Sequence, residues 1–224
     1  MNNEKKSDKA TRSDCMIFVV DDDRRMCLAV TDLLTAAGYP CVAFGSIASY
    51  CSFARPDLPG CLILDVGLPS ISGLEFQKQI DLNAHPPIVF ITGHGDIPSA
   101  VHAIQRGAVN FLTKPFQEAD LLRSVDVAIE LDRNTRSERS ELREIQRRLA
   151  TLTPREREVL PLVASGLLNK QAAAQLRISE VTLQIHRSKI MQKLGTPSIA
   201  DLARAAERLK IPITHARGTG KTLK

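Results

Sequence analysis

Between Cys15 and residue 131 the chain alternates five times between a short apolar run and a longer segment whose apolar residues have helical spacing. The apolar runs cover residues 16–20, 40–44, 61–64, 87–91 and 109–112. The helical segments cover residues 24–37, 46–54, 73–82, 98–106 and 118–131. Apolar runs rich in Val, Ile and Phe that are set between helices are typical of buried parallel strands. The pattern predicts an α/β fold, a doubly wound five-stranded parallel sheet with helices on both faces.

Three of these apolar runs end in a charged residue. The first leads into Asp21-Asp22-Asp23, the third into Asp65 and the fifth into Lys114-Pro115, while Thr92 follows the fourth. Because the carboxyl ends of parallel strands line up along one edge of a sheet, these side chains are expected to meet there. Carboxylates that face one lysine predict a divalent cation with oxygen ligands, beside an Asp that can accept a phosphoryl group.

Each of these residues also has a simpler interpretation when it is taken alone. An Asp at the end of a strand often only caps the next helix, and Lys-Pro often only makes a turn. Their joint placement after the first, third, fourth and fifth strands favours one functional site over several unrelated local roles.

The charged residues are unevenly divided along the chain. Residues 1–130 hold 11 Lys or Arg and 16 Asp or Glu, a net charge of −5, whereas residues 131–224 hold 19 and 9, a net charge of +10. An acidic part joined to a basic part indicates one domain that handles a cation and a second that meets a polyanion.

No apolar stretch approaches the roughly 20 residues of a membrane span, and the first apolar run is too short for a secretion signal. The sequence therefore predicts a cytoplasmic protein without membrane contact. Its five cysteines all lie in the first half and include no Cys-x-x-Cys pair, which indicates neither a disulfide framework nor a zinc site. We expect them to be small core residues, because a redox-sensing thiol needs an exposed, low-pKa setting that the sequence does not show.

The basic part of the chain predicts an all-α domain of four helices. They cover residues 154–164, 169–176, 180–194 and 198–209. Residues 132–150 are dense in Arg and Glu and lack Pro and Gly, so they are expected to continue the preceding helix as a long helical linker. The predicted organisation is a disordered leader at 1–14, an α/β domain at 15–131, the linker at 132–150, the all-α domain at 151–212 and a basic tail at 213–224.

Within the linker, Leu142, Ile145 and Leu149 have the 3,4 spacing of one apolar helix face. The stripe covers only about one heptad of a coiled coil. It fits either a short dimer seam or a stripe that packs on the neighbouring domain, and the sequence leaves both open.

The first helix of the basic part has a well-marked start. Thr153 is a candidate N-cap, Pro154 stands at the first helical position, and Glu156 completes a capping box. Pro161 lies within the same helix, where it should remove one backbone hydrogen bond and bend the segment.

The second and third helices of the basic part are separated only by Arg177-Ile178-Ser179. Two helices joined by such a tight turn in a basic domain predict a helix-turn-helix that binds DNA. A helical hairpin with a structural or dimerising role would show the same turn.

Residues 15–131 resemble the receiver domain of bacterial two-component response regulators, which has a flavodoxin-like fold. The matching segments are Val20-Asp21-Asp22, Leu64-Asp65 with Pro69 and Gly73, Ile91-Thr92-Gly93, and Phe111 with Lys114-Pro115. Leu68 stands where the family usually has Met, a volume-conserving exchange. Gly67 lacks a side chain where many relatives carry one near the attacking water, which bears on the lifetime of the phosphoryl group.

The resemblance implies a role for each residue of the acidic cluster. Asp65 would be the phosphoacceptor, and Mg²⁺ would be held by Asp21, Asp22, Asp65 and the backbone carbonyl of Gly67. Three crowded carboxylates repel one another, and a dication relieves that repulsion while it screens the incoming phosphoryl group.

The same resemblance implies a switch. Thr92 and Lys114 would bind phosphoryl oxygens, and the Lys114–Pro115 bond would be cis. When the hydroxyl of Thr92 moves toward the phosphoryl group, it vacates space that the Phe111 ring can fill, which alters the neighbouring surface.

Residues 151–209 resemble the LuxR-type DNA-binding domain. The matching residues are Thr153-Pro-Arg-Glu-Arg-Glu-Val-Leu160, Gly166, Asn169-Lys170, Ile178-Ser179-Glu180, Thr182, His186-Arg187, Ile190-Met191 and Lys193-Leu194. Together the two domains are similar to the FixJ-like subfamily of transcriptional activators. The implied function is a two-component response regulator that a sensor histidine kinase phosphorylates on Asp65, and that then binds promoter DNA, activates transcription with RNA polymerase, and forms a homodimer on phosphorylation or on DNA.

On the helix at 180–194, Leu183, Ile190 and Leu194 share one face and are expected to be core. The side chains away from that stripe are candidates for base edges: Gln184, Ile185, Ser188 and Gln192. The candidates for phosphate contacts are Lys170, Thr182, Arg187 and Lys189. Because the Gln184 amide both donates and accepts, it suits the N6/N7 edge of adenine.

Two other classes of protein compete with this interpretation. A haloacid-dehalogenase-type phosphatase also combines a strand-end Asp with Mg²⁺ and a lysine, but it needs a second Asp two residues later, where this chain has Gly67. A receiver that only docks on a motor or scaffold would not need a helix-turn-helix. We therefore expect a regulator and not an enzyme.

Overall fold

The structure is a computed structural model that describes residues 14–81, 84–93 and 97–212. The chain divides into two compact units between Arg136 and Ser137. Each unit is described by itself. The expected leader at 1–14, apart from Asp14, and the expected basic tail at 213–224 lie outside the described residues.

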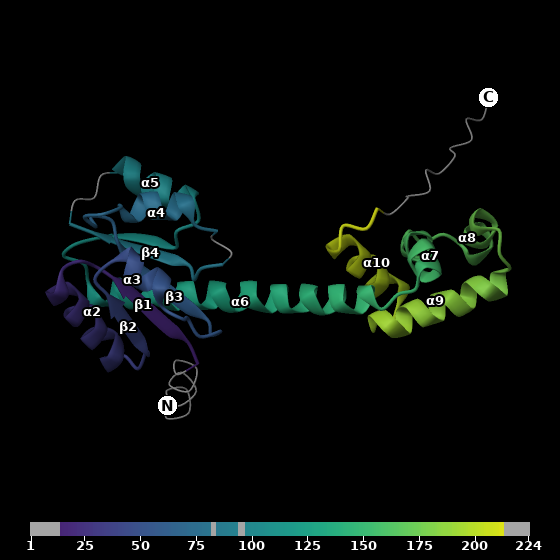
Figure 1. Cartoon of the computed structure of the whole chain (residues 1–224), viewed down its shortest axis with the longest axis horizontal. Helices are drawn as coiled ribbons and strands as arrows, with labels where there is room; N and C mark the ends of the chain where they lie inside the picture. The colour runs from purple at the N-terminus through teal and green to yellow at the C-terminus, as the bar shows by residue number, and fades with distance from the viewer. Residues whose placement is uncertain (1–13, 82–83, 94–96, 213–224) are drawn as a thin grey trace. The chain divides into compact units, whose positions relative to one another are not determined.

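The N-terminal unit contains the predicted five-stranded parallel sheet (Figure 1). Its strands are β1 (Met16–Val20), β2 (Cys41–Phe44), β3 (Gly60–Asp65), β4 (Ile88–Thr92) and β5 (Asn110–Thr113). The strand order is β2-β1-β3-β4-β5. In the register of the sheet, Asp65 lies opposite Ile91, and Thr92 lies opposite Thr113. The strand ends that carry the predicted functional residues therefore lie along one edge.

Among the described residues, five helices begin in this unit, and the last of them, α6, continues into the C-terminal unit. They are α2 (Arg24–Ala36), α3 (Ile47–Ser52), α4 (Gly73–Gln79), α5 (Ile97–Gln105) and α6 (Glu118–Ala150). The alternation of side chains along β1 explains how they divide between the two faces of the sheet. Ile17 and Val19 pack in one buried cluster with residues of α2 and α6, whereas Phe18 and Val20 pack in a second with residues of α3, α4 and α5. The doubly wound fold predicted from the sequence is confirmed.

Local signals explain where the helices of this unit begin and end. Asp23 and Ser72 cap α2 and α4, because their side chains accept hydrogen bonds from backbone N–H groups of the first turn. Gly38 and Gly107 follow α2 and α5 with φ of +90° and +91°. Glycine adopts this conformation at little cost, so both helices end where the sequence predicts.

Asp132 fastens α6 to the sheet. The residue is 4% exposed. Its carboxylate accepts a hydrogen bond from the backbone nitrogen of Gly60 at 2.9 Å, at the start of β3, and another from Nε of Arg136 at 2.9 Å. A buried carboxylate needs such donors to offset its lost hydration. The helix thus continues past residue 131, and the expected linker at 132–150 is helical.

The C-terminal unit contains the predicted helical domain (Figure 1). Its helices are α7 (Pro154–Ala164), α8 (Asn169–Leu176), α9 (Glu180–Leu194) and α10 (Ile199–Arg208). Leu183, Ile190 and Leu194 are buried in its core, as expected. Arg177, in the turn between α8 and α9, adopts a left-handed conformation with φ of +53°. The short turn confirms the helix-turn-helix geometry.

A few sequence-based expectations need correction. The largest shift in an element's bounds is at the end of α4, which stops at Gln79 and not at residue 82, because Ile80 turns extended. Helix α7, by contrast, has the predicted bounds and contains Pro161. Of the five cysteines, Cys41 is half-buried and Cys51 is exposed on α3, so only three are core residues.

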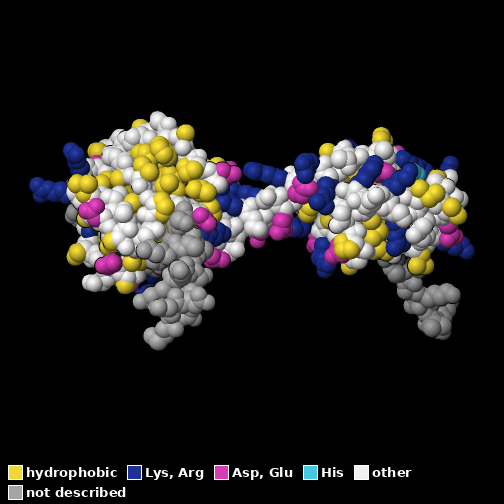
Figure 2. Space-filling view, turned by 90° about the horizontal axis from the view of Figure 1, so that it is seen from below, with side chains coloured by type: hydrophobic (Ala, Val, Ile, Leu, Met, Phe, Trp, Pro, Cys, Tyr) yellow, Lys and Arg dark blue, Asp and Glu magenta, His cyan; other side chains and the backbone are white. Residues whose placement is uncertain are grey.

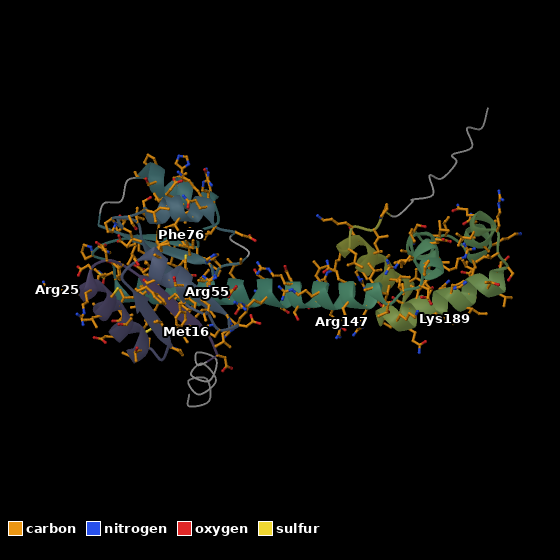
Figure 3. The ribbon with its side chains drawn as sticks, viewed as in Figure 1. Met16, Arg25, Arg55, Phe76, Arg147 and Lys189 are labelled. Atoms are coloured by element: carbon orange, nitrogen blue, oxygen red, sulfur yellow. The ribbon has the colours of Figure 1, made fainter. Side chains whose placement is uncertain are left out.

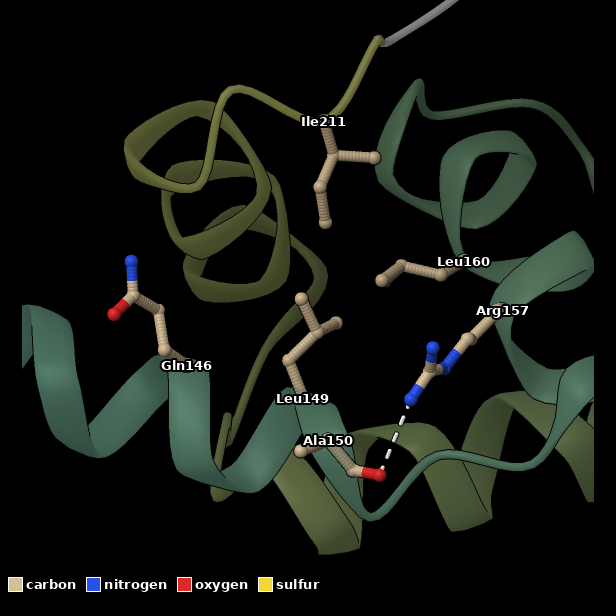
Figure 4. Close-up of a pocket in the computed structure, with 6 residues that line it drawn as sticks. All are labelled: Gln146, Leu149, Ala150, Arg157, Leu160 and Ile211. Atoms are coloured by element: carbon tan, nitrogen blue, oxygen red, sulfur yellow. Dashed lines mark hydrogen bonds between the residues drawn. The ribbon is translucent and has the colours of Figure 1, made fainter.

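A surface cavity of about 400 Å³ lies in the C-terminal unit (Figure 4). It is lined by Gln146, Leu149, Ala150, Arg157, Leu160 and Ile211. Nη2 of Arg157 donates to the backbone oxygen of Ala150 at 3.2 Å and ties α7 to the end of α6. Leu149 packs against the helical core here, which favours the packing interpretation for this residue of the linker stripe. Leu142 and Ile145 are half-buried.

Candidate functional site

The carboxyl edge of the sheet brings together the polar residues that follow its strands. Nζ of Lys114 donates to Oδ2 of Asp21 at 2.6 Å and to Oδ1 of Asp65 at 2.7 Å. Asp21 follows β1, Asp65 ends β3 and Lys114 follows β5, so these ion pairs join residues 49 and 93 positions apart in the chain. The parallel topology alone explains how such distant residues meet.

Asp22 completes a cluster of three carboxylates. Oxygen atoms of Asp21, Asp22 and Asp65 all lie within 4.8 Å of one another. Asp21 and Asp65 are buried and Asp22 is exposed, so the cluster opens to solvent on one side. A hard divalent cation prefers oxygen ligands, and three carboxylates at this separation suit Mg²⁺. The donor set therefore fits the cation that the sequence predicts.

The backbone fixes the two buried carboxylates. Oδ1 of Asp21 accepts from the nitrogen of Asp23 at 2.9 Å, and Oδ2 of Asp65 accepts from the nitrogen of Gly67 at 2.6 Å. Gly73 allows the loop after β3 to approach closely, because a Cβ there would lie 2.4 Å from the backbone oxygen of Asp65. Both carboxylates are thus held in place before any ligand binds.

Burial and charge act in opposite directions on the ionisable groups of this site. Burial raises the pKa of Asp21 above its usual value, although the hydrogen bond from Lys114 opposes the change. Burial by itself lowers the pKa of Lys114, but hydrogen bonds to Asp21 and Asp65 outweigh it, and the pKa lies above its usual value. Lys114 therefore stays charged. A divalent cation next to Asp21 would favour its carboxylate form.

The two predicted switch residues flank this cluster. Thr92 is 3% exposed and ends β4, and its backbone oxygen accepts from the nitrogen of Lys114 at 2.7 Å. The Lys114–Pro115 bond is cis, as the family resemblance implies. The half-buried ring of Phe111 lies 6.0 Å from the ring of Phe90. Thr92 is thus joined to Lys114 by a backbone hydrogen bond, and Phe111 precedes Lys114 by three positions on the same strand end.

A second candidate site is the exposed side of α9. The expected base-reading residues Gln184, Ile185, Ser188 and Gln192 are all exposed. Among the expected phosphate contacts, Lys170 and Lys189 are exposed, whereas Thr182 and Arg187 are half-buried. Figure 3 labels Lys189 on α9, and Figure 2 shows Lys and Arg side chains spread over one face of this unit.

Three polar side chains link the two helices of the helix-turn-helix. Nη1 of Arg187 donates to Oδ1 of Asn169 at 3.1 Å, and Nδ2 of Asn169 donates to Oε1 of Gln184 at 2.8 Å. The sequence places Asn169 beside Lys170 in a family motif but does not show that it contacts Gln184. Arg187, which is expected to contact a DNA phosphate, uses one of its N–H donors to bind Asn169.

Comparison with known proteins gives a family match for each unit. Residues 17–126 match the response regulator receiver domain, and residues 150–206 match the bacterial regulatory proteins of the luxR family. The chain is 45% identical over 205 residues to Nodulation protein W of Bradyrhizobium diazoefficiens, which covers 91% of this chain and 90% of that protein. It is 36% identical to the transcriptional regulatory protein FixJ of the same species, over 86% of this chain and 94% of that one.

A solved structure supports the same assignment. The structure of the response regulator StyR is 40% identical and superposes with a TM-score of 0.75, covering 88% of this chain and all of that one. The chain therefore belongs to the two-component response regulators, in the FixJ-like group that joins a receiver domain to a LuxR-type domain. It is a regulator of transcription, and its two domains imply a sensor kinase and DNA as partners. No helix in the described part of the chain is long and apolar enough to cross a membrane.

Proposed function

We propose that Asp65 accepts a phosphoryl group from a cognate sensor histidine kinase. This proposal rests on the pair of short hydrogen bonds from Lys114 to Asp21 and Asp65, within a cluster of three carboxylates. One oxygen of Asp65 would attack the phosphorus as the bond to the kinase histidine breaks. Lys114 would then bind a phosphoryl oxygen as a point positive charge.

Mg²⁺ fits this site as the cofactor. Asp21, Asp22, Asp65 and the backbone carbonyl of Gly67 would hold it. When bound, the cation neutralises the crowded carboxylates and screens the charge of the phosphoryl group. The hydrogen bond from the nitrogen of Gly67 to Asp65 already sets the orientation of the nucleophile.

We propose that Thr92 and Phe111 transmit the phosphorylation to the surface. Thr92 lies at the end of β4, next to the lysine that would hold the phosphoryl group. Its hydroxyl would move toward the phosphoryl oxygens, and the Phe111 ring, packed near Phe90, would fill the vacated space. The surface of α5 and β5 would change as a result.

The output is a change in promoter binding and not a catalysed reaction. A phosphatase of the haloacid-dehalogenase type needs a second Asp where Gly67 stands, which favours a regulator over an enzyme. We infer that the chain acts in the cytoplasm, where it would meet promoter DNA, and activates transcription through RNA polymerase. Helix α9 would lie in the major groove.

Activation is expected to produce a homodimer through α5 and β5. Three large apolar side chains of α5 are already exposed, and a second copy would cover them: Ile97, Val101 and Ile104. Beryllofluoride, a phosphoryl mimic, should therefore double the mass measured by light scattering at micromolar protein and increase affinity for promoter DNA. An unchanged mass both free and on DNA would contradict this dimer.

Lys170→Ala is expected to weaken binding to every DNA sequence alike. Lys170 is exposed at the start of α8, where a cation reaches the phosphate backbone. The loss of one phosphate contact should reduce the slope of log affinity against log salt by about one unit. Fluorescence anisotropy over a salt series, with operator and scrambled duplexes, measures both effects. Arg143→Ala, which removes an exposed charge from α6, is the control and should leave the slope unchanged.

A further inference from the structure

We propose that Asn169 is a positioning residue for operator recognition, because it turns the Gln184 amide so that its donors, and not its acceptor, face the DNA bases. This inference rests on the proposed placement of α9 in the major groove. Asn169 begins α8 and Gln184 lies in the second turn of α9, so the contact spans the two helices of the helix-turn-helix.

The order of donors and acceptors in this network is forced by Arg187. A guanidinium group has only N–H donors, so the atom of Asn169 that faces Arg187 must be its oxygen. The NH₂ group of Asn169 therefore faces Gln184. Because that group can only donate, the atom of Gln184 at 2.8 Å from it must be the oxygen. The two-fold ambiguity of an amide side chain is thus removed twice in succession.

The consequence for Gln184 is a fixed polarity. Its Oε1 is turned toward α8 and engaged, while both hydrogens of its NH₂ group remain for the exposed side. A freely rotating glutamine can pair with adenine by placing oxygen and nitrogen on the base together. Here the available group is a donor, which suits a base edge that presents acceptors.

The structure of the major groove then selects among bases. Guanine presents two neighbouring acceptors, O6 and N7, and thymine presents O4, whereas cytosine presents the N4 donor. We expect Gln184 to prefer guanine at its base pair and to disfavour cytosine on the same strand. This differs from the adenine preference that the residue type alone predicts.

Asn169→Asp provides the sharpest test. An aspartate has nearly the same shape but can only accept, so Gln184 must rotate to donate to it and would present its oxygen to the DNA. The preference should invert toward a base that offers a donor, cytosine or adenine. Asn169→Ala removes the constraint, so both kinds of base should then be accepted.

The variants are compared by selection from a randomised double-stranded DNA library, with the full chain activated by beryllofluoride. Gln171→Glu is the matched control. It adds the same charge to the first turn of α8, and a carboxylate can still accept the hydrogen bond from the nitrogen of Leu168. Wild type and Gln171→Glu should yield the same consensus.

Asn169→Asp should change the preference about tenfold at one base pair per half-site. Gln184→Ala should lose its preference at that same pair. An unchanged consensus for Asn169→Asp, or a change at a different pair, would overturn the proposal. If Asn169→Asp binds no DNA, the test falls to Asn169→Ala. A base preference in that variant as strong as in the wild type would overturn the proposal. A Gln184→Ala variant with the wild-type consensus would instead contradict the placement of Gln184 at the bases.

Discussion

Asp65→Asn is expected to abolish phosphoryl incorporation. Asparagine keeps one acceptor oxygen, which can serve the nitrogen of Gly67, while its NH₂ group takes the place of the oxygen that accepts from Lys114. Lys114 keeps its hydrogen bond to Asp21, so the loop should retain its structure. The amide, however, is not a nucleophile toward phosphorus. Acetyl phosphate with Mg²⁺, followed by intact-mass spectrometry, should add one phosphoryl group to the wild type and none to the variant.

Two controls separate this site from its surroundings. Asp23→Asn makes the same chemical change in the neighbouring loop, where asparagine can still cap α2, and should be labelled like the wild type. Chelation of divalent cations should suppress labelling of the wild type, because the carboxylates would then repel the phosphoryl donor. Equal labelling of wild type and Asp65→Asn would refute the assignment of the phosphoacceptor.

The sheet and its functional edge could be predicted because their signals are local. Each strand is a short apolar run, and a parallel topology places every carboxyl end on the same edge. Asp21, Asp65 and Lys114 needed only to follow the correct strands to be brought together. The capping box of Thr153 and Glu156 is also confirmed, since it depends on residues three positions apart.

Contacts between distant polar residues could not be predicted in this way. Asp132 meets Gly60 across 72 positions, and Asn169 meets Gln184 across 15. Neither pair has a periodicity or spacing that marks it in the sequence, because the contact depends on how two elements pack. Asp132 in particular resembles any other charge in a linker that is rich in Arg and Glu.

Glu156, a buried acidic residue of the C-terminal unit, also makes a contact with a residue distant in the sequence, Lys193. Glu156 is 3% exposed, and its Oε2 accepts from the backbone nitrogen of Thr153 at 2.8 Å and from Nζ of Lys193 at 2.6 Å. The first bond caps α7 and the second joins α7 to α9. The hydrogen bond from Lys193, followed by that from the Thr153 backbone, lowers the pKa of Glu156 below its usual value.

Glu156→Ala should lower the free energy of opening of α7 by about 2 kcal/mol, because it removes a cap and leaves Lys193 without its partner. We set this below the value for a fully buried pair, since a third of the Lys193 side chain is exposed. Hydrogen exchange of α7 in the full chain measures it.

The effect should depend on pH in a defined direction. Because the pKa of Glu156 is lower in the folded state, its stabilisation is present above the unfolded value of 4.5 and is lost as the pH falls through the folded value. The difference between wild type and Glu156→Ala should therefore stay constant down to about pH 5 and shrink as the pH falls below 4.5. Glu158→Ala is the matched control on the same helix. Its ion pair with Arg155 is exposed, so its removal should cost less than about 1 kcal/mol. Equal losses for the two variants would show that Glu156 does not stabilise the packing of α7 on α9.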